Sequence, residues 1–352
     1  MPTLQDLQRQ RGAQFQDNKV PLTFGDEGQA IAAVKSGVAL YDRSHWGRLK
    51  LGDRDRLSFL HNQTTNDLKR LQPGEGCETV LLTSTARTID LLSAYVTEED
   101  ILILTSPQRR TDILSWLDRY IFFGDKVQLT DSTDETVCFS LLGPKSTELL
   151  KTLGVETLPQ TLDHHCLSAI ANVTVRIAYG SGLSGPGYTA IAEKSQGAAL
   201  WQAFAEAGAV PLGEQTWEEL RIKAGRPVAG AELTEDYNPL EAGLWQTISF
   251  NKGCYIGQET IARLNTYNGV KQQLWGLQFA ESSHPEALAP GELIYLDDQK
   301  VGTLTSLSAD HSFGLGYLKT KAGGAGLSVR IGEAIAIATE VPFLSREPAK
   351  TP

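Results

Sequence analysis

Apolar and polar positions along the N-terminal part of the chain follow an order of predicted elements that occurs twice, over residues 46–122 and 136–208. Each copy begins with a strand and a helix, continues with three strands of alternating apolar residues, and ends with a second helix. The predicted strands are Arg48–Gly52, Glu78–Ser84, Thr88–Val96 and Ile101–Thr105, then Val137–Leu142, Leu167–Ala171, Val173–Tyr179 and Tyr188–Glu193. The predicted helices run from Asp53 to His61, Pro107 to Tyr120, Pro144 to Leu153 and Ser195 to Ala207.

This order predicts two related α+β units with mixed or antiparallel sheets, each covered by helices on one side. Leu51-Gly52 and Leu142-Gly143 take the same place in the two copies. After Lys271 the segments become short and alternating, which predicts a small antiparallel β-barrel or sandwich. Its expected strands are Gln273–Phe279, Leu293–Leu296, Val301–Leu307, Gly314–Tyr317 and Glu333–Val341. We therefore expect a body over residues 1–270, closed by residues 209–270, and a C-terminal domain over 271–352.

Composition and charge narrow the class of protein. A chain of 352 residues is long enough for more than one core. Its formal charge of −10 argues against general binding to nucleic acids or anionic membranes. Apolar runs are shorter than the roughly 20 residues that span a bilayer, and residues 1–10 lack the apolar core of a secretory signal. We expect a cytoplasmic protein, or one of an organelle matrix or stroma if a presequence has been removed.

The four cysteines, Cys77, Cys138, Cys166 and Cys254, form no C-x-x-C pair, which favours a reducing compartment and predicts no metal site. A different motif, G-x-G-x-x-G, occurs at residues 180–185. A dinucleotide-binding loop must open a helix, whereas residues 186–192 predict a loop and a strand. The motif therefore favours a hairpin over a nucleotide site.

Residues 251–260 combine a thiol and an ammonium, since Lys252 and Cys254 are two positions apart in a glycine-punctuated loop. Residues 258–264 predict a helix directly after it. A thiol beside a lysine and near a helix N-terminus ionises readily, which favours redox or ligand chemistry. The alternative is a small buried cysteine in a tight turn.

Residues 252–259 read K-G-C-Y-I-G-Q-E and resemble the K-G-C-[aromatic]-x-G-Q-E signature of the YgfZ family of folate-binding proteins, relatives of the glycine-cleavage T-protein, an aminomethyltransferase. Residues 37–45, 225–230 and 238–244 resemble further segments of that superfamily in the expected order. The resemblance implies a ring-like body of two α+β units around a central channel, with a β-barrel appended.

Two positions depart from the aminomethyltransferase pattern. The motif G-Y-T-G-E ends in a glutamate that helps to hold the pterin of folate, whereas this chain has Ile191, which cannot accept hydrogen bonds from an aminopyrimidine edge. The T-protein carries an acidic D-D-L pair where this chain has Asp90-Leu91-Leu92. An isolated aspartate in an apolar strand needs either a bonded partner or a solvent-facing position, and both interpretations of Asp90 remain open.

The resemblance implies tetrahydrofolate, or a one-carbon derivative of it, as the cofactor. Glu241 would bind the pterin as a buried carboxyl group, or it is an exposed carboxylate at a helix start. Tyr255 would stack on a flat ring or fill core. The implied catalytic residues are Cys254, Lys252 and Asp90. The implied cofactor-binding residues are Asp90, Glu241, Tyr188, Arg226, Tyr255 and Arg263.

The cysteine signature, the T-protein-like frame and the two missing carboxylates together favour a tetrahydrofolate-binding protein that supports the assembly or repair of iron–sulfur clusters. Its expected partners are folate and iron–sulfur client or assembly proteins. The alternative is a folate-dependent transferase that turns over a methyl or aminomethyl group. Ile191 favours a third hypothesis, a scaffold that has lost folate binding.

Overall fold

The computed structural model describes residues 2–16, 20–280 and 288–348 of the chain. These residues group into two compact units. Unit 1 comprises Met1–Leu60, Leu68–Glu78 and Leu92–Trp217, and unit 2 comprises His61–Asp67, Thr79–Leu91 and Glu218–Pro352. Among the described helices, none is long and apolar enough to cross a membrane.

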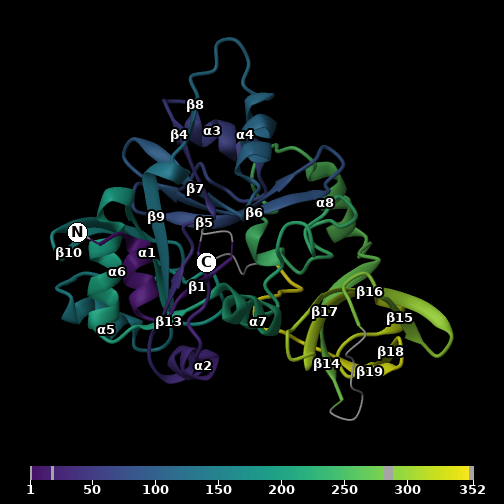
Figure 1. The fold of residues 1–352 in the computed structure, drawn as a ribbon. Coiled ribbons are helices and arrows are strands. Elements are labelled where there is room, and N and C mark those ends of the chain that lie inside the picture. The colour runs from purple at the N-terminus through teal and green to yellow at the C-terminus, as the bar shows by residue number, and fades with distance from the viewer. Residues whose placement is uncertain (1, 17–19, 281–287, 349–352) are drawn as a thin grey trace. The chain divides into compact units, whose positions relative to one another are not determined.

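The first sheet has the strand order β5-β6-β7-β4-β8, in which β4 pairs with β7 and β8, and β6 with β7, all antiparallel (Figure 1). Its strands are β4 (Gly47–Gly52), β5 (Gly76–Leu82), β6 (Thr88–Val96), β7 (Asp100–Thr105) and β8 (Gln128–Asp131). Along the chain, β5 passes from unit 1 into unit 2 after Glu78, and β6 passes from unit 2 back into unit 1 after Leu91.

The second sheet belongs to unit 1 and has the order β10-β11-β12-β9-β3-β13. It is mixed, because β13 pairs with β3 in parallel while the other pairs are antiparallel. Its strands are β3 (Ala39–Asp42), β9 (Thr136–Leu142), β10 (His165–Ile170), β11 (Val173–Tyr179), β12 (Gly187–Glu193) and β13 (Val210–Leu212). The motif at residues 180–185 lies in the β11–β12 hairpin and is followed by a strand, as predicted.

The predicted repeat is confirmed in the order of elements and in the topology. The first copy runs β4, α3 (Arg56–Gln63), β5, β6, β7 and α4 (Arg110–Asp118). The second runs β9, α5 (Ser146–Thr152), β10, β11, β12 and α6 (Gly197–Glu206). In each sheet the first strand of the copy pairs with the fourth, giving the equivalent orders β5-β6-β7-β4 and β10-β11-β12-β9.

The turn after the first strand corrects the predicted alignment of the two copies. Gly143 has a φ of 126°, and the residue in the same structural position is Asp53, with a φ of 74°, rather than Gly52. The Arg56 amide donates to the Asp53 carbonyl just as the Ser146 amide donates to the Gly143 carbonyl. A left-handed residue cannot lie inside a helix, so α3 begins at Arg56 and not directly after Asp53.

The predicted helix from Pro107 was also too long, for a related reason. Gln108 has a φ of 63°, which delays α4 until Arg110. The other helices of the chain are α1 (Leu4–Gln10), α2 (Glu27–Ser36), α7 (Glu214–Ala224) and α8 (Gln258–Thr266), with 3₁₀ turns at Thr133–Glu135, Lys194–Gln196, Trp245–Thr247 and Thr320–Ala322. A short pair, β1 (Gln14–Phe15) and β2 (Pro21–Thr23), completes unit 1.

Alternation along the strands divides the apolar side chains of unit 1 between two clusters. One face of the second sheet packs against α1, α5 and α6 through a cluster that includes Tyr188, Ala190, Trp201 and Phe204. The opposite face contributes Cys138, Ala178 and Ile191 to a smaller cluster with Tyr95, Leu102 and Leu104 of β6 and β7. The helices therefore cover one side of this sheet, as predicted.

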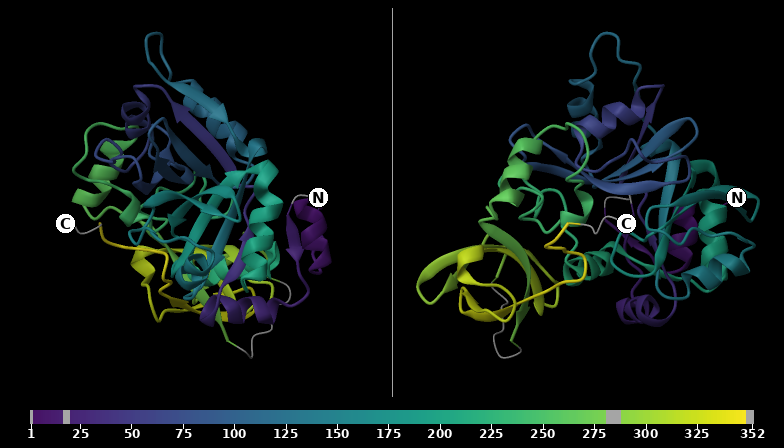
Figure 2. Two further views of the ribbon diagram at one scale, coloured as in Figure 1. Left: turned by 90° about the vertical axis from the view of Figure 1, so that its left-hand side faces the viewer. Right: turned by 180° about the vertical axis from the view of Figure 1, so that it is seen from behind.

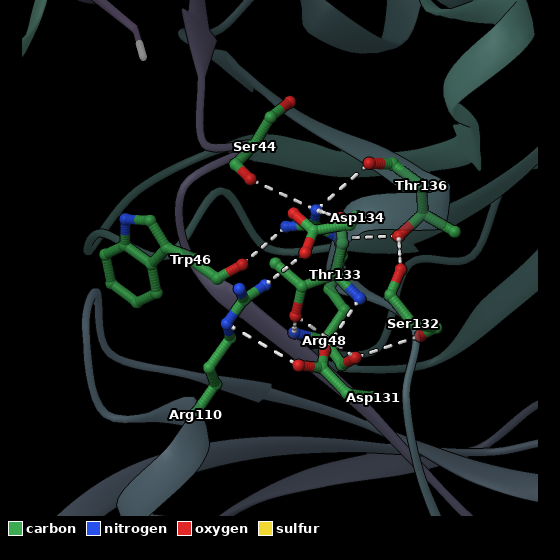
Figure 3. A network of polar contacts seen from close by, with 9 residues as sticks. All are labelled: Ser44, Trp46, Arg48, Arg110, Asp131, Ser132, Thr133, Asp134 and Thr136. Carbon is green, nitrogen blue, oxygen red and sulfur yellow. Dashed lines mark hydrogen bonds and ion pairs between the residues drawn. The ribbon is translucent and has the colours of Figure 1, made fainter. Parts of the chain in front are cut away.

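Arg48 of β4 is fully buried and anchors a polar network inside unit 1 (Figure 3). Its guanidinium donates to the Thr136 hydroxyl (2.7 Å) and to the carbonyl oxygens of Trp46 (2.5 Å), Ser44 (3.1 Å), Thr133 (2.5 Å) and Thr136 (3.0 Å). Burial lowers the pKa of Arg48. The side chain thus ties β4 to the segment that leads into β9.

The C-terminal region forms the predicted antiparallel barrel, closed in the order β14-β17-β16-β15-β18-β19 (Figures 1 and 2). Its strands are β14 (Gln272–Phe279), β15 (Leu293–Leu296), β16 (Gln299–Leu307), β17 (Phe313–Lys319), β18 (Ser328–Ile331) and β19 (Ala334–Thr339). Among these strands only β18 was missed. The first barrel strand begins at Gln272. The division of the chain into domains after residue 270 stays a prediction.

Candidate functional site

The cysteine loop, residues 251–257, lies in unit 2 and leads directly into α8, as the sequence predicts. Gly257 precedes the helix with a φ of 83°, and a Cβ atom there would lie 3.0 Å from the Thr83 carbonyl oxygen. Glycine is therefore required for both the backbone angle and the close packing. The Gln258 side chain accepts a hydrogen bond from the Tyr255 amide at 3.1 Å, which closes the turn.

Lys252 fixes this loop to the last turn of α3 and to the segment that follows it. Its Nζ donates to the carbonyl oxygens of His61 (2.6 Å), Thr64 (2.7 Å) and Asn66 (2.7 Å). An ammonium has three N–H donors, so these bonds match its full capacity. The Ile256 amide adds a bond to the Asn62 carbonyl at 3.0 Å. Lys252 therefore positions the loop, and its predicted catalytic influence on Cys254 stays a prediction.

Lys252→Met should loosen the loop without unfolding unit 2. Three hydrogen bonds to a charged donor are lost from a half-buried site, and we expect a destabilisation of about 2 kcal/mol. Hydrogen exchange followed by mass spectrometry should show faster exchange of residues 252–257, including the Ile256 amide. Lys321→Met removes an exposed lysine of unit 2 and serves as the control. Unchanged exchange in Lys252→Met would contradict the positioning role.

Cys254 is exposed, which removes the alternative of a buried structural cysteine. The other cysteines differ: Cys138 is buried, and Cys77 and Cys166 are partly covered. Burial raises the pKa of both Cys138 and Cys166, which favours their protonated thiols. Cys254 is thus the cysteine best placed to meet a partner or a reagent.

Glu241 lies in the turn of residues 238–244, also in unit 2. The Asn238 side chain accepts hydrogen bonds from the Leu240 and Glu241 amides, and Glu241 Oε2 accepts from the Asn238 amide at 3.1 Å. Only 6% of Glu241 is exposed, and this burial raises the pKa of its carboxyl group. The structure therefore favours the buried carboxyl interpretation over an exposed helix-start carboxylate.

Asp90 is fully buried on β6, which excludes the solvent-facing interpretation. Its Oδ1 accepts a hydrogen bond from the Leu91 amide at 2.9 Å. The start of the same strand reaches the Glu241 turn, since the Thr88 amide donates to the Tyr237 carbonyl at 3.0 Å and Arg87 donates to the Asp236 carbonyl at 2.8 Å. Unit 2 thus holds Asp90, Glu241 and the cysteine loop.

The remaining predicted residues are more dispersed. Arg226 is buried, with its guanidinium 5.0 Å from the Phe343 ring centre, and Arg263 is exposed on α8. Tyr255 packs against the core of unit 2, where burial raises its pKa to about 12, and lies 4.8 Å from Lys252 Nζ. Tyr188 lies in the other unit, inside the apolar core, with its hydroxyl 3.0 Å from that of Thr147.

Sequence reasoning missed an aromatic pair next to Glu241. The Tyr237 ring stacks on the buried Tyr317 ring with centroids 3.5 Å apart and planes 10° from parallel. Burial, Asp236 and Glu241 raise the pKa of Tyr237. The sequence did point to Tyr237 as a site residue, because it directly precedes the Asn-Pro-Leu-Glu segment. Its pairing with Tyr317, eighty positions further along, carried no sequence signal.

Comparison with known proteins identifies the family of this chain. Residues 4–252 match the GCVT N-terminal domain. The chain therefore belongs to the family that this domain defines. The chloroplastic "Putative transferase At1g60990" of Arabidopsis thaliana is 41% identical over 342 residues, which cover 96% of this chain and 78% of the relative. An aminomethyltransferase of Halalkalibacterium halodurans is 27% identical over 360 residues and 97% of each chain.

The fold has a solved counterpart. The crystal structure of the glycine cleavage system aminomethyltransferase T from Bartonella henselae aligns with a TM-score of 0.84 at 19% identity, covering 99% of this chain and 98% of that one. At this identity the match concerns the fold alone. It confirms the predicted T-protein-like α+β architecture with its appended barrel.

Proposed function

We propose that this chain binds tetrahydrofolate, or a one-carbon derivative, and supports the assembly or repair of iron–sulfur clusters in client enzymes through Cys254. The observation that carries the proposal is an exposed thiol on a loop fixed by Lys252, in the same unit as two buried carboxyl residues. A thiol held on a rigid, accessible loop can contact a client protein. The YgfZ-like signature around it supports this assignment over general aminomethyl transfer.

The residues of unit 2 fit the chemistry of a folate. A pterin presents a flat ring and an aminopyrimidine edge, which need an apolar surface and a hydrogen-bonding carboxyl group. The Tyr237–Tyr317 stack and the neighbouring Glu241 supply both. Arg263, exposed on α8, is a candidate for the glutamate tail. When bound, tetrahydrofolate would supply nitrogen atoms that capture or release a one-carbon unit.

Ile191 supports the assignment of the pterin to Glu241, because position 191 cannot supply the hydrogen-bonding carboxyl group. It packs among Tyr95, Leu102 and Ala178 in unit 1, an apolar cluster in which an unpaired carboxylate would be costly. The position that carries the pterin glutamate in aminomethyltransferases therefore offers no carboxyl group in this chain. We accordingly place the pterin edge on Glu241.

Glu241→Gln should weaken tetrahydrofolate binding about tenfold to a hundredfold, since the loss of one hydrogen bond to a charged or ionisable group costs about 1.5–3 kcal/mol. Calorimetric titration of the purified protein measures this effect, and Asp90→Asn should weaken binding in the same direction. Glu235→Gln, an exposed neighbour, is the matched control. Absence of any binding at millimolar folate would favour the scaffold hypothesis instead.

The second candidate is a folate-dependent aminomethyl or methyl transferase. It is favoured by the family and by the buried Asp90, which would position the folate nitrogens. Formation of methylenetetrahydrofolate, assayed directly, separates the two functions. Turnover that disappears in Asp90→Asn would favour the enzyme, whereas folate binding without turnover would favour support of clients.

The relative from Arabidopsis is named as chloroplastic, which supports the organelle alternative for the location of this chain over the cytoplasm. Iron–sulfur client or assembly proteins remain the proposed protein partners. Both assignments can be tested by recovery of the tagged protein from fractionated cells and by identification of what is cross-linked to Cys254.

A further inference from the structure

Unit 1 contains a cavity of about 820 Å³, lined by residues of α1, of the start of α6 and of the segments that lead into α4 and β9. This volume is in the range of small-molecule sites. Apolar side chains such as Leu4 and Val137 line it together with hydroxyl, amide and charged groups. None of the residues proposed above for folate or thiol chemistry is among those that line it. The cavity is therefore a separate candidate site.

Asp42, at the end of β3, brings a buried carboxylate to this cavity, with 5% of the residue exposed. Its Oδ1 accepts a hydrogen bond from the Ser44 amide at 2.9 Å, and its Oδ2 accepts one from the Gln8 side chain at 2.8 Å. The Ser44 side chain adds a further hydrogen bond. A carboxylate has about four acceptor positions, so Asp42 can still accept from a ligand.

The charge of Asp42 has no counter-ion, because no residue that the structure describes forms an ion pair with it. Burial accordingly raises the pKa of its carboxyl group. A buried carboxylate without a counter-ion is costly, and a cation bound beside it would offset that cost. The chemistry of Asp42 therefore favours a positively charged ligand group.

Gln8 provides a second acceptor beside this carboxylate. Only 1% of Gln8 is exposed, and the residue lines the same cavity. Its side-chain nitrogen donates to Asp42, whereas its side-chain oxygen accepts no hydrogen bond from the described residues. A ligand group that satisfies both residues needs a positive charge and several N–H donors. An ammonium or a guanidinium has both properties.

Most other charged side chains at the cavity are already paired. Arg110 forms ion pairs with Asp131 at 3.5 Å and with Asp134 at 3.1 Å (Figure 3). His45 Nε2 lies 3.5 Å from Glu214 Oε2, so a protonated His45 has a counter-ion. These groups therefore add little net charge to the cavity.

Lys194 differs from them, because the described structure gives it no ion pair. It lines the cavity from an exposed position in the 3₁₀ turn before α6. The cavity thus has one unpaired negative charge, which is buried on Asp42, and one unpaired positive charge, which is exposed on Lys194. A ligand that complements both carries a cationic group at one end and an anionic group at the other.

We propose that this cavity binds a small zwitterionic amino acid, with its ammonium or guanidinium group on Asp42 and Gln8 and its carboxylate toward Lys194. No covalent step is involved. The inference holds independently of folate and of iron–sulfur clients, since their proposed residues do not line the cavity.

Calorimetric titration of the full chain with the standard L-amino acids and γ-aminobutyrate, each at millimolar concentration, tests the proposal. We expect saturable binding of at least one of these probes. Asp42→Asn should weaken it about tenfold to a hundredfold, because a hydrogen-bonded charge is lost. Lys194→Met should weaken it about twofold to fivefold, because an exposed ion pair contributes less. Lys151→Met, at another exposed lysine of unit 1, is the control and should leave binding unchanged.

A second variant keeps the test decisive if Asp42→Asn does not fold. Ala199 is exposed on α6 and lines the cavity, so Ala199→Trp should fill part of the space and abolish binding without disturbing the core. Circular dichroism establishes that each variant is folded. Absence of binding by every probe would overturn the proposal, as would binding that folded Asp42→Asn and Ala199→Trp leave unchanged. Equal binding of the amine that lacks only the carboxylate of the tightest probe would overturn the zwitterion assignment.

Discussion

Replacing Cys254 with serine is expected to abolish the support of iron–sulfur enzymes while leaving the fold and folate binding intact. The side chain is exposed and lies on a loop fixed by Lys252, so its sulfur contributes little to the core. A serine hydroxyl stays protonated at neutral pH and is a poor nucleophile and a poor soft ligand. In a strain deleted for its own counterpart of this protein, Cys254→Ser should reduce the activities of client enzymes to the level of the deletion.

The partly covered Cys166 provides the matched control. Cys166→Ser makes the same chemical change in unit 1 and should restore client activity as well as the wild type does. Tetrahydrofolate titration of both variants separates the thiol from the folate site. If Cys254→Ser restores the clients fully, the thiol-centred function is wrong, and the folate-dependent transferase becomes the better hypothesis.

A short apolar run made β12 predictable. Along it, Tyr188 and Ala190 face the helix-covered core, while Ile191 faces the other cluster. Because both faces are buried, the strand is visible in the sequence as a run of mainly apolar residues after a glycine-rich turn. The turn before α3 was not predictable in the same way. Asp53 adopts the left-handed conformation that Gly143 adopts in the second copy, so matching glycine to glycine gave an alignment wrong by one residue.

The candidate site was predictable where its residues lie in one short motif. Cys254 is two positions after Lys252, and the helix after them follows from the apolar spacing. The function of the Lys252 ammonium was not predictable, because its acceptors are backbone carbonyls 186 to 191 positions away, and any residue type supplies a carbonyl. The proximity of His61 to Gly253 was not predictable either, since it depends on the same long-range packing.

Tyr188 is a residue whose predicted role stays a prediction and whose packing offers a second explanation. Its place in a Gly-Tyr-Thr segment implied a contact with the cofactor. The structure places it in the apolar core of unit 1, edge-to-face with Tyr179 at 5.3 Å. A tyrosine on a buried strand satisfies its hydroxyl locally, here with Thr147. The implied cofactor contact remains untested, and the packing accounts for the residue without it.

The largest effect on stability is expected at Arg48. Its guanidinium is fully buried and donates to five acceptors, four of which are carbonyl oxygens on Ser44, Trp46, Thr133 and Thr136 (Figure 3). Removing it leaves these buried oxygens without a donor and opens a cavity. A hydrophobic replacement cannot compensate, because the surrounding groups stay polar.

Arg48→Met should therefore lower the free energy of unfolding of unit 1 by about 3–5 kcal/mol, since a hydrogen bond to a charged group contributes about 1.5–3 kcal/mol and several acceptors lose theirs together. Arg48→Lys keeps the charge but cannot reach all acceptors with one ammonium, so an intermediate loss is expected. Urea unfolding followed by circular dichroism measures both. Arg54→Met, at a side chain 74% exposed, should change the unfolding free energy by less than about 0.5 kcal/mol. A loss in Arg48→Met no larger than in Arg54→Met would mean that water replaces the guanidinium at little cost, and that the hydrogen bonds of the Arg48 backbone to Ser132 and Thr133 are enough to join β4 to the segment before β9.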